Sequence, residues 1–310
     1  FLFLLVCALQ LTPATSNVAH PPCGDGLIVA VECKDHHLLA ALAARPSRLV
    51  QALFRKQASL DAALAYIDAN SLTARLSAAP WDGKTLPYVG NNVNGIIVNE
   101  NDVATPERKR VLAPAGIART FSGKVILTKE REAGGDEWTH NLYNAGGVNC
   151  SQDSLVGPPK HLKWKAGPEF GRSHENISSV SAMVSNGGRI YAIMDVGPKA
   201  SIYLPSKWLL TARDAYSGVL LWQKELPNWH ARLFPLKNDG ASLQVARRLV
   251  AADGHVYVTL GLDAPVSKID GATGEIKAVY SDTRHAEELV YSAGKLITIC
   301  ADDTSVQEYR

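Results

Sequence analysis

The chain has 310 residues, a net charge of +2 and 20% charged residues. This length is sufficient for two domains, because a single hydrophobic core rarely grows beyond about 250 residues. The balanced charge excludes a strongly basic or acidic binding protein and gives no reason to expect nucleic acid or an anionic membrane as the main partner. The apolar content of 46% is typical of a globular protein.

The first 20 residues predict an export signal. An unbroken apolar run covers Phe1–Leu9, and small and polar residues follow around Thr12–Ala19. This pattern is typical of the hydrophobic and cleavage regions of a secretory signal, and the alternative is a buried strand or helix of the mature fold. The run is shorter than the roughly 20 apolar residues that cross a bilayer. We therefore expect a periplasmic or secreted protein with no transmembrane span after signal removal.

Cysteine usage gives little further constraint. Cys23, Cys33, Cys150 and Cys300 lie beyond the predicted signal, are far apart, and form no CxxC pair. Two of them could form a disulfide in an exported protein, and their pairing stays open. The chain lacks an initiating Met and ends inside a strand-rich unit, so we interpret it as a fragment cut at both ends.

From residue 24 to 130 the pattern predicts an α/β domain. The apolar run "LIVAVEC" predicts a buried strand, and "HHLLAALAARPSRLVQAL" has helical spacing broken by Pro46. "SLDAALAYIDANS" predicts a helix with Ser59 as its N-cap. Residues 94–100 predict another strand, and residues 106–118 predict a helix that closes on a Pro-x-Gly turn. This alternation favours an open α/β sheet.

The order of elements resembles the class I S-adenosylmethionine-dependent methyltransferase fold, a Rossmann-like arrangement. The resemblance rests on "LPYVGNNVNGIIVNE" followed by "ERKRVLAPAGIA". It implies a Gly-rich turn after the first strand and a carboxylate after the second, which hold the cofactor. Here Glu32, Lys34 and His36 occupy the turn, and Phe54 and Arg55 end the second strand. We expect a degenerate domain that does not bind S-adenosylmethionine.

From residue 134 to 310 the pattern changes to short strands bounded by turn residues. Segments 186–195, 252–261 and 292–301 each begin with a glycine-bearing turn and continue as a strand. The first two are followed by an Asp–x–x–(Ser/Thr)–Gly turn, with Asp214/Gly218 and Asp270/Gly274 offset by 56 residues. Repeats of this size predict propeller blades. The alternative is two unrelated hairpins in a β-sandwich.

The motif "ARDAYSGVLLW" resembles the quinoprotein-type propeller repeat. The resemblance implies that Trp222 packs between neighbouring blades, and Ala278 stands at the equivalent position of the second copy. Residues 136–164 resemble the opening of quinoprotein alcohol dehydrogenase propellers, and the matching positions are Trp138, Asn149, Ser151, Leu162 and Trp164. Together with the methyltransferase-like segment, the chain resembles large exported bacterial proteins with pyrroloquinoline quinone (PQQ)-like repeats, and we expect an incomplete propeller.

Two functions remain open for this second half. A quinoprotein enzyme needs PQQ, Ca²⁺ held by oxygen ligands and a carboxylate base. Candidate cofactor-binding residues are Arg172, His174, Glu175 and Asn176, with Asp195 as a further oxygen ligand. The simpler interpretation of that cluster is a solvated loop, and His140 near Asp136 is interpreted as a hydrogen-bonding residue rather than a base.

The predicted function is therefore an exported binding or scaffold protein with a protein or saccharide ligand. PQQ-dependent oxidation of alcohols or sugars is the alternative, and methyl transfer is the third possibility. No nucleic-acid partner is expected.

Overall fold

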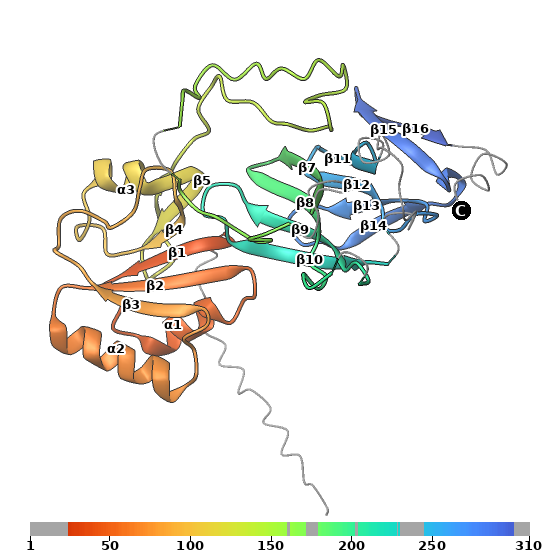
Figure 1. Ribbon diagram of the computed structural model, residues 1–310. Coiled ribbons are helices and arrows are strands. Elements are labelled where there is room, and N and C mark those ends of the chain that lie inside the picture. Colours follow the sequence, from red (N-terminus) through yellow and green to blue (C-terminus); the bar gives the residue numbers. More distant parts are fainter. Residues whose placement is uncertain are drawn as a thin grey trace, which may run out of the picture.

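The computed structural model describes residues 24–159, 162–171, 179–201, 204–227, 229 and 245–300. An α/β domain is followed by a region rich in β-sheet (Figure 1). The predicted signal (residues 1–20) and the candidate cofactor residues Arg172, His174, Glu175 and Asn176 lie outside the described residues. Among the helices that are described, none combines the length and apolarity needed to cross a membrane.

The α/β domain contains one six-stranded sheet in the order β3-β2-β1-β4-β5-β6. Its strands are β1 (Gly26–Val31), β2 (Arg48–Phe54), β3 (Leu76–Pro80), β4 (Val93–Ile97), β5 (Leu112–Arg119) and β6 (Val125–Thr128). The first five strands are parallel, and β6 is antiparallel to β5. The chain reverses its direction of strand addition between β1 and β4, which makes the carboxyl ends of these two strands the topological switch point.

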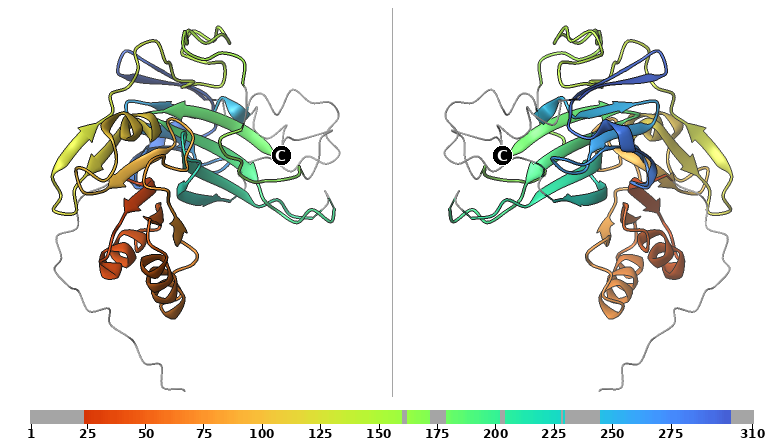
Figure 2. Two further views of the ribbon diagram at one scale, coloured as in Figure 1. Left: turned by 90° about the vertical axis from the view of Figure 1, so that its left-hand side faces the viewer. Right: turned by 90° about the vertical axis from the view of Figure 1, so that its right-hand side faces the viewer.

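Helices cover both faces of this sheet, so its strands are apolar on both sides. Helices α1 (His36–Ala43) and α2 (Gln57–Ala69) pack on the face that carries Ile28 and Val50 (Figure 2). Helix α3 (Thr105–Val111) contributes to the core on the other face, with Trp81 and Leu86 from the segment after β3. The result is a three-layer domain.

Two local predictions for this domain are wrong. Helix α2 begins at Gln57 rather than after Ser59, and its N-cap residue Lys56 makes no side-chain capping bond. The helix expected over residues 106–118 ends at Val111, because Leu112 is already extended and begins β5. Burial of β5 against β4 overrides the local helical pattern, and Pro114 cannot continue a helix.

The second region consists of three antiparallel units. The first sheet contains β7 (Val180–Asn186), β8 (Arg189–Asp195), β9 (Trp208–Asp214) and β10 (Leu220–Leu226). The second sheet contains β11 (Leu249–Ala252), β12 (His255–Thr259), β13 (Val266–Asp270) and β14 (Ile276–Tyr280). A 3₁₀ turn (Ser281–Thr283) leads to the hairpin sheet, β15 (Ala286–Ser292) and β16 (Lys295–Cys300).

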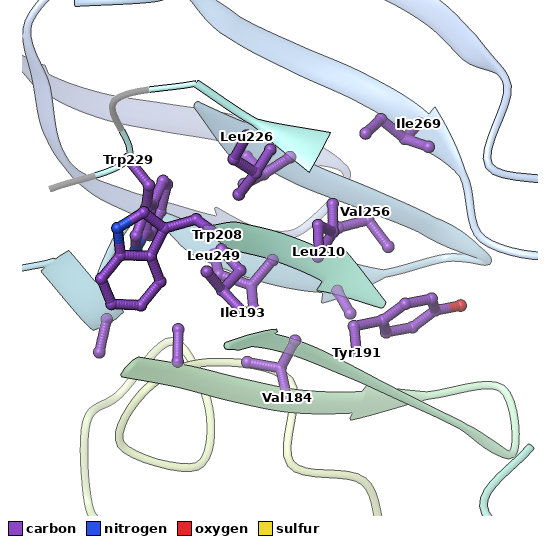
Figure 3. Close-up of a cluster of buried hydrophobic side chains, with 14 of the residues drawn as sticks. Val184, Tyr191, Ile193, Trp208, Leu210, Leu226, Trp229, Leu249, Val256 and Ile269 are labelled. Carbon is purple, nitrogen blue, oxygen red and sulfur yellow. The ribbon is translucent and has the colours of Figure 1, made fainter. Parts of the chain in front are cut away.

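These units stack face to face in chain order, with β11 between β7 and β15. Figure 3 shows the core between the first two sheets, where Tyr191, Ile193 and Leu210 meet Leu249 and Val256. A smaller core joins the second sheet to the hairpin sheet. The described strands close no ring, so the structure shows a β-sheet-rich region, and the propeller stays a prediction.

Candidate functional site

The first candidate site is the carboxyl edge of the α/β sheet, where an open parallel sheet binds its ligands. Glu32 follows β1 there and has a left-handed φ of 56°, a conformation that favours glycine. Arg55 follows β2, and Asp102 lies in the segment after β4. Three charged side chains thus come from the ends of three adjacent strands.

These charges are paired with one another across the switch point. The Arg55 guanidinium donates from Nε to Glu32 Oε1 at 3.1 Å and from Nη2 to Asp102 Oδ1 at 3.1 Å. The backbone N–H of Arg55 also donates to Glu32 Oε1, at 2.6 Å, and the hydrogen bond that the Arg55 side chain donates to Glu32 raises the pKa of Arg55. Side chains of this domain therefore occupy the edge where a nucleotide-like ligand would bind.

The first turn of α1, next to this bridge, is capped by a side chain of the same domain. A helix N-terminus after the first strand presents free N–H groups that suit an anionic ligand. Here Asp35 is the N-cap, and its carboxylate accepts the N–H of Leu38 at 3.0 Å. Lys34 is exposed and Phe54 is buried in the core. The absence of small residues was visible in the sequence, whereas Asp102 as the second partner of Arg55 was missed, because 47 residues separate the two.

The second set of predicted residues lies at two corners of the stacked sheets. Asp214 Oδ1 accepts the N–H groups of Tyr216 and Ser217 at 3.1 and 2.7 Å and the Ser217 hydroxyl at 2.7 Å. In both corners the glycine four residues after the Asp has φ of 74° and donates its N–H to the Asp carbonyl at 2.9 Å.

The second corner repeats this set of bonds. Asp270 Oδ1 accepts the N–H groups of Ala272 and Thr273 at 3.0 and 2.8 Å and the Thr273 hydroxyl at 3.0 Å. The bonds satisfy the polar groups of the turn and hold the carboxylate in place, so the corner is a structural device.

An indole packs over each corner glycine. Trp164 Nε1 donates to the carbonyl of Ala215 at 3.1 Å, and Trp222 Nε1 donates to the carbonyl of Gly271 at 3.0 Å. A Cβ on Gly218 would lie 2.5 Å from Trp164, and a Cβ on Gly274 would lie 2.7 Å from Trp222. Glycine is therefore required at each corner for two reasons: its φ is positive, and the indole ring approaches too closely for a Cβ.

A short segment, Trp138–His140, crosses all three stacked units. Ser185 of β7 donates its N–H to the Trp138 carbonyl at 2.6 Å, and Ala251 of β11 donates to the Thr139 carbonyl at 3.0 Å. Tyr291 of β15 donates to His140 Nε2 at 3.0 Å. The three donors hold the same place in their units, because each lies three residues before the glycine at the second position of the turn that follows.

His140 serves as an acceptor in this segment. Because Nε2 accepts the Tyr291 N–H, the ring proton lies on Nδ1, which faces the Thr139 hydroxyl at 2.8 Å. The imidazole is buried, and burial lowers the pKa of His140. A neutral ring with both nitrogens engaged is a structural contact, in agreement with its interpretation from the sequence.

The remaining polar candidates are engaged in loop structure. Asp136 accepts the Ser151 hydroxyl at 2.9 Å and the N–H of Gln152 at 2.6 Å. Asp195 Oδ1 accepts the N–H groups of Gly197 and Lys207 at 2.8 and 2.9 Å. Within the described ranges no group of three or more His, Cys, Asp or Glu side chains could hold a metal ion. The three cysteines in the described residues, Cys33, Cys150 and Cys300, are free thiols. Cys23 lies outside the described residues.

The two regions meet at the amino edge of the α/β sheet, on the side opposite the switch point. Asn94 of β4 donates from Nδ2 to Asp214 Oδ2 at 2.7 Å and accepts the N–H of Leu27 at 2.9 Å. A Cβ on Gly26 would lie 2.2 Å from Asn94 Oδ1, so glycine is needed beside it. The corner carboxylate thus has two uses, one oxygen for its own turn and one for the α/β domain.

Comparisons with known proteins place this chain in no family. No family model matches it, and no curated protein matches it. Among solved structures it is similar to the [4+2]-cyclase SpnF, with 22% identity over 39% of this chain and 45% of that chain at a TM-score of 0.28.

Two methyltransferases are similar to a comparable extent. Geranyl diphosphate C-methyltransferase from Streptomyces coelicolor A3(2) shows 15% identity over 33% of this chain and 40% of that chain, at a TM-score of 0.29. A SAM-dependent methyltransferase from Aquifex aeolicus shows 16% identity over 30% of this chain and 54% of that chain, at a TM-score of 0.26. The chain spans about half the length of these proteins or less, and TM-scores this low carry no argument about function.

Proposed function

We propose that this protein is an exported, non-catalytic binding or scaffold protein, in which PQQ-like propeller repeats follow a methyltransferase-like domain that has lost its cofactor site. The observation that carries the proposal is the Glu32–Arg55–Asp102 bridge. It lies at the edge where S-adenosylmethionine would have to bind, and the Asp35 carboxylate caps the Leu38 N–H of the helix beside it. A domain that keeps this outline without an open site is suited to holding other parts of the protein in place.

The matched corners support the repeat part of the proposal. Asp214/Gly218 and Asp270/Gly274 make equivalent bonds in neighbouring sheets, and Trp164 and Trp222 cover the two glycines in the same way. Four-stranded antiparallel units joined by such contacts fit propeller blades. A stack of this kind offers broad surfaces to a protein or saccharide ligand.

Titration calorimetry with S-adenosylmethionine tests the first half of the proposal. We expect no heat of binding with the wild-type chain, and saturable micromolar binding would overturn the claim of a lost site. Arg55→Ala is the matched variant, since it removes the cation of the bridge while leaving Glu32 and Asp102 in place. Binding that appears only in this variant would identify the bridge as the element that excludes the cofactor.

Reconstitution tests the second half. The chain is incubated with Ca²⁺ and PQQ, and dye-linked oxidation of alcohols and sugars is measured. We expect no turnover. Cofactor-dependent oxidation would overturn the scaffold proposal in favour of a quinoprotein oxidoreductase.

A further inference from the structure

The three stacked units share one tight turn. The first two strands of each unit are joined by the turns Gly187–Gly188, Asp253–Gly254 and Ala293–Gly294, and both turn residues have positive φ in every case, between 48° and 76°. Two positive φ values are typical of a type I′ hairpin. The second residue of each turn is a glycine, and it serves as the reference from which equivalent positions in the three units are counted.

The two side chains that lie three and five residues after this glycine are buried in two of the units and exposed in the third. In the first sheet they are Tyr191 and Ile193, both 0% exposed, and in the second sheet they are Tyr257 and Thr259, at 3% and 0%. In the hairpin sheet they are Ile297 and Ile299, at 55% and 53%. The same face of the repeat is therefore buried in the first and second sheets and exposed in the hairpin sheet, where it carries two isoleucines.

In both buried copies the next unit in the chain covers this face. The Tyr191 hydroxyl donates to the carbonyl of Gly271 in the second sheet at 3.1 Å. The Tyr257 ring stacks on Tyr291 of the hairpin sheet, with ring centroids 5.2 Å apart. The interface therefore has a direction, since each unit presents this face to its successor.

The covering unit presents the same three positions in both interfaces. They lie five and three residues before the turn glycine and two residues after it, and they are Leu249, Ala251 and Val256 in the second sheet and Leu289, Tyr291 and Leu296 in the hairpin sheet. An antiparallel hairpin with apolar side chains at these positions is the shape and chemistry that the face accepts.

Within the described residues, the β16 edge of the hairpin sheet has no partner strand beyond β15. Strand β8 pairs with β9, and β12 pairs with β13, whereas in the described part of the chain β16 pairs only with β15. Its sequence KLITIC contains no Pro, and an unprotected edge of β-branched residues is a template for strand pairing. Face and edge are therefore open on the same strand.

We propose that the Ile297/Ile299 face and the β16 edge form a docking surface for a further antiparallel β-hairpin of the same repeat type. The occupant packs its apolar side on the two isoleucines in the way that the hairpin sheet packs on Tyr257. This inference rests on the repeat part of the proposed function and names the kind of partner. Its test uses neither cofactor, so its failure leaves the cofactor experiments to decide the proposed function.

The probe is a backbone-cyclised peptide with the sequence of residues 286–300, with Ser in place of Cys300 and fluorescein on Lys295. Cyclisation holds the isolated hairpin in shape, because a free two-stranded hairpin is only marginally stable. Fluorescence anisotropy is measured while the full 310-residue chain is added. We expect saturable binding that Ile297→Lys weakens by about tenfold or more, since a charge in the centre of an apolar contact is not compensated.

Val279→Lys is the matched control, because Val279 is also 55% exposed and lies on β14, outside the proposed face. It should bind the peptide as the wild-type chain does, and Ile299→Lys should reproduce the loss. No binding, or equal weakening by Val279→Lys, overturns the proposal. Binding that Ile297→Lys leaves unchanged also overturns it, because the peptide would then be displacing the hairpin sheet from Tyr257. A dimer in sedimentation analysis that Ile297→Lys abolishes would assign the face to a second copy and overturn the hairpin partner.

Discussion

The switch point of the α/β sheet and the open face of the hairpin sheet are opposite outcomes at two places where binding is expected. At the switch point, Arg55 bonds to both Glu32 and Asp102, so the edge where an open α/β sheet binds its ligands carries three paired charges. At the hairpin sheet, Ile297 and Ile299 hold the position that the next unit covers elsewhere, and they remain exposed. A fold outline therefore does not locate a binding site; the side chains at the relevant edge decide whether it is closed or open.

The largest expected effect concerns the indole that joins the first sheet to the second. Trp222→Ala removes the packing over Gly274 and the bond to the Gly271 carbonyl. We expect a loss of about 3 kcal/mol in the free energy of unfolding, the usual cost of a large aromatic truncation. Urea denaturation measures it. Trp222→Phe keeps an aromatic ring over Gly274 and loses the indole N–H bond, so it should cost clearly less; equal losses would mean that the ring packing is unimportant.

The next prediction compares the two corners. Asp214→Ala and Asp270→Ala both remove the carboxylate that holds the turn, and only Asp214 also accepts a bond from Asn94 of the α/β domain. We expect Asp214→Ala to cost about 1 kcal/mol more in unfolding free energy than Asp270→Ala, the net worth of one hydrogen bond. Asn94→Ala should reproduce the difference. If the two aspartate variants are equally stable, the contact between the regions contributes nothing.

A pH prediction follows from His140. Its pKa is lowered by burial in the folded protein, so the folded state binds the proton less readily than the unfolded state does. The stability that His140 contributes is therefore complete above about pH 6.5, the ordinary value for histidine, and is lost as the pH falls toward the lowered pKa. A protonated ring cannot accept the Tyr291 N–H.

His140→Gln tests this prediction, because glutamine offers a non-titrating acceptor. Thermal denaturation between pH 8 and pH 5 should show a steeper loss of stability in the wild-type chain than in the variant. Parallel curves would show that another group controls the acid sensitivity.

The smallest expected effect on stability concerns the Glu32–Arg55–Asp102 bridge. Arg55 is 47% exposed, and exposed ion pairs contribute little because solvent screens them. We expect Arg55→Ala to change the free energy of unfolding by less than about 1 kcal/mol, measured by urea denaturation. A larger loss would make the bridge a stability element as well as an obstacle to a ligand.

Local patterns predicted much of the fold. The apolar runs gave β1 and β4, and the glycine-bearing turns marked the hairpins β7–β8, β11–β12 and β15–β16 at their observed places. The helix expected over residues 106–118 was wrong, since the Leu112–Arg119 stretch forms a strand between β4 and β6. A short Ala- and Leu-containing stretch suits either structure, and its neighbours in the sheet decide between them.

The candidate sites divide in the same way. Glu32 and Arg55 were recognisable as unsuited to a cofactor turn from their residue types alone. Their partner Asp102 and the link from Asn94 to Asp214 were not, because 120 residues separate the latter pair. The segment Trp138–His140 lies in residues 136–164, which resemble the opening of a quinoprotein propeller, but nothing local indicated that it bonds to all three units, the last of them 151 residues away.

The sequence by itself determined most of the strands, which turns need glycine, and which positions carry charge or an indole. These properties follow from backbone sterics and from alternation of side chains, which act over a few residues. Only the tertiary structure decided that Arg55 bonds to both Glu32 and Asp102, that Asn94 joins the α/β domain to Asp214, and that Ile297 and Ile299 are left uncovered. Such outcomes depend on which surfaces meet, and burial is a property of the assembled stack.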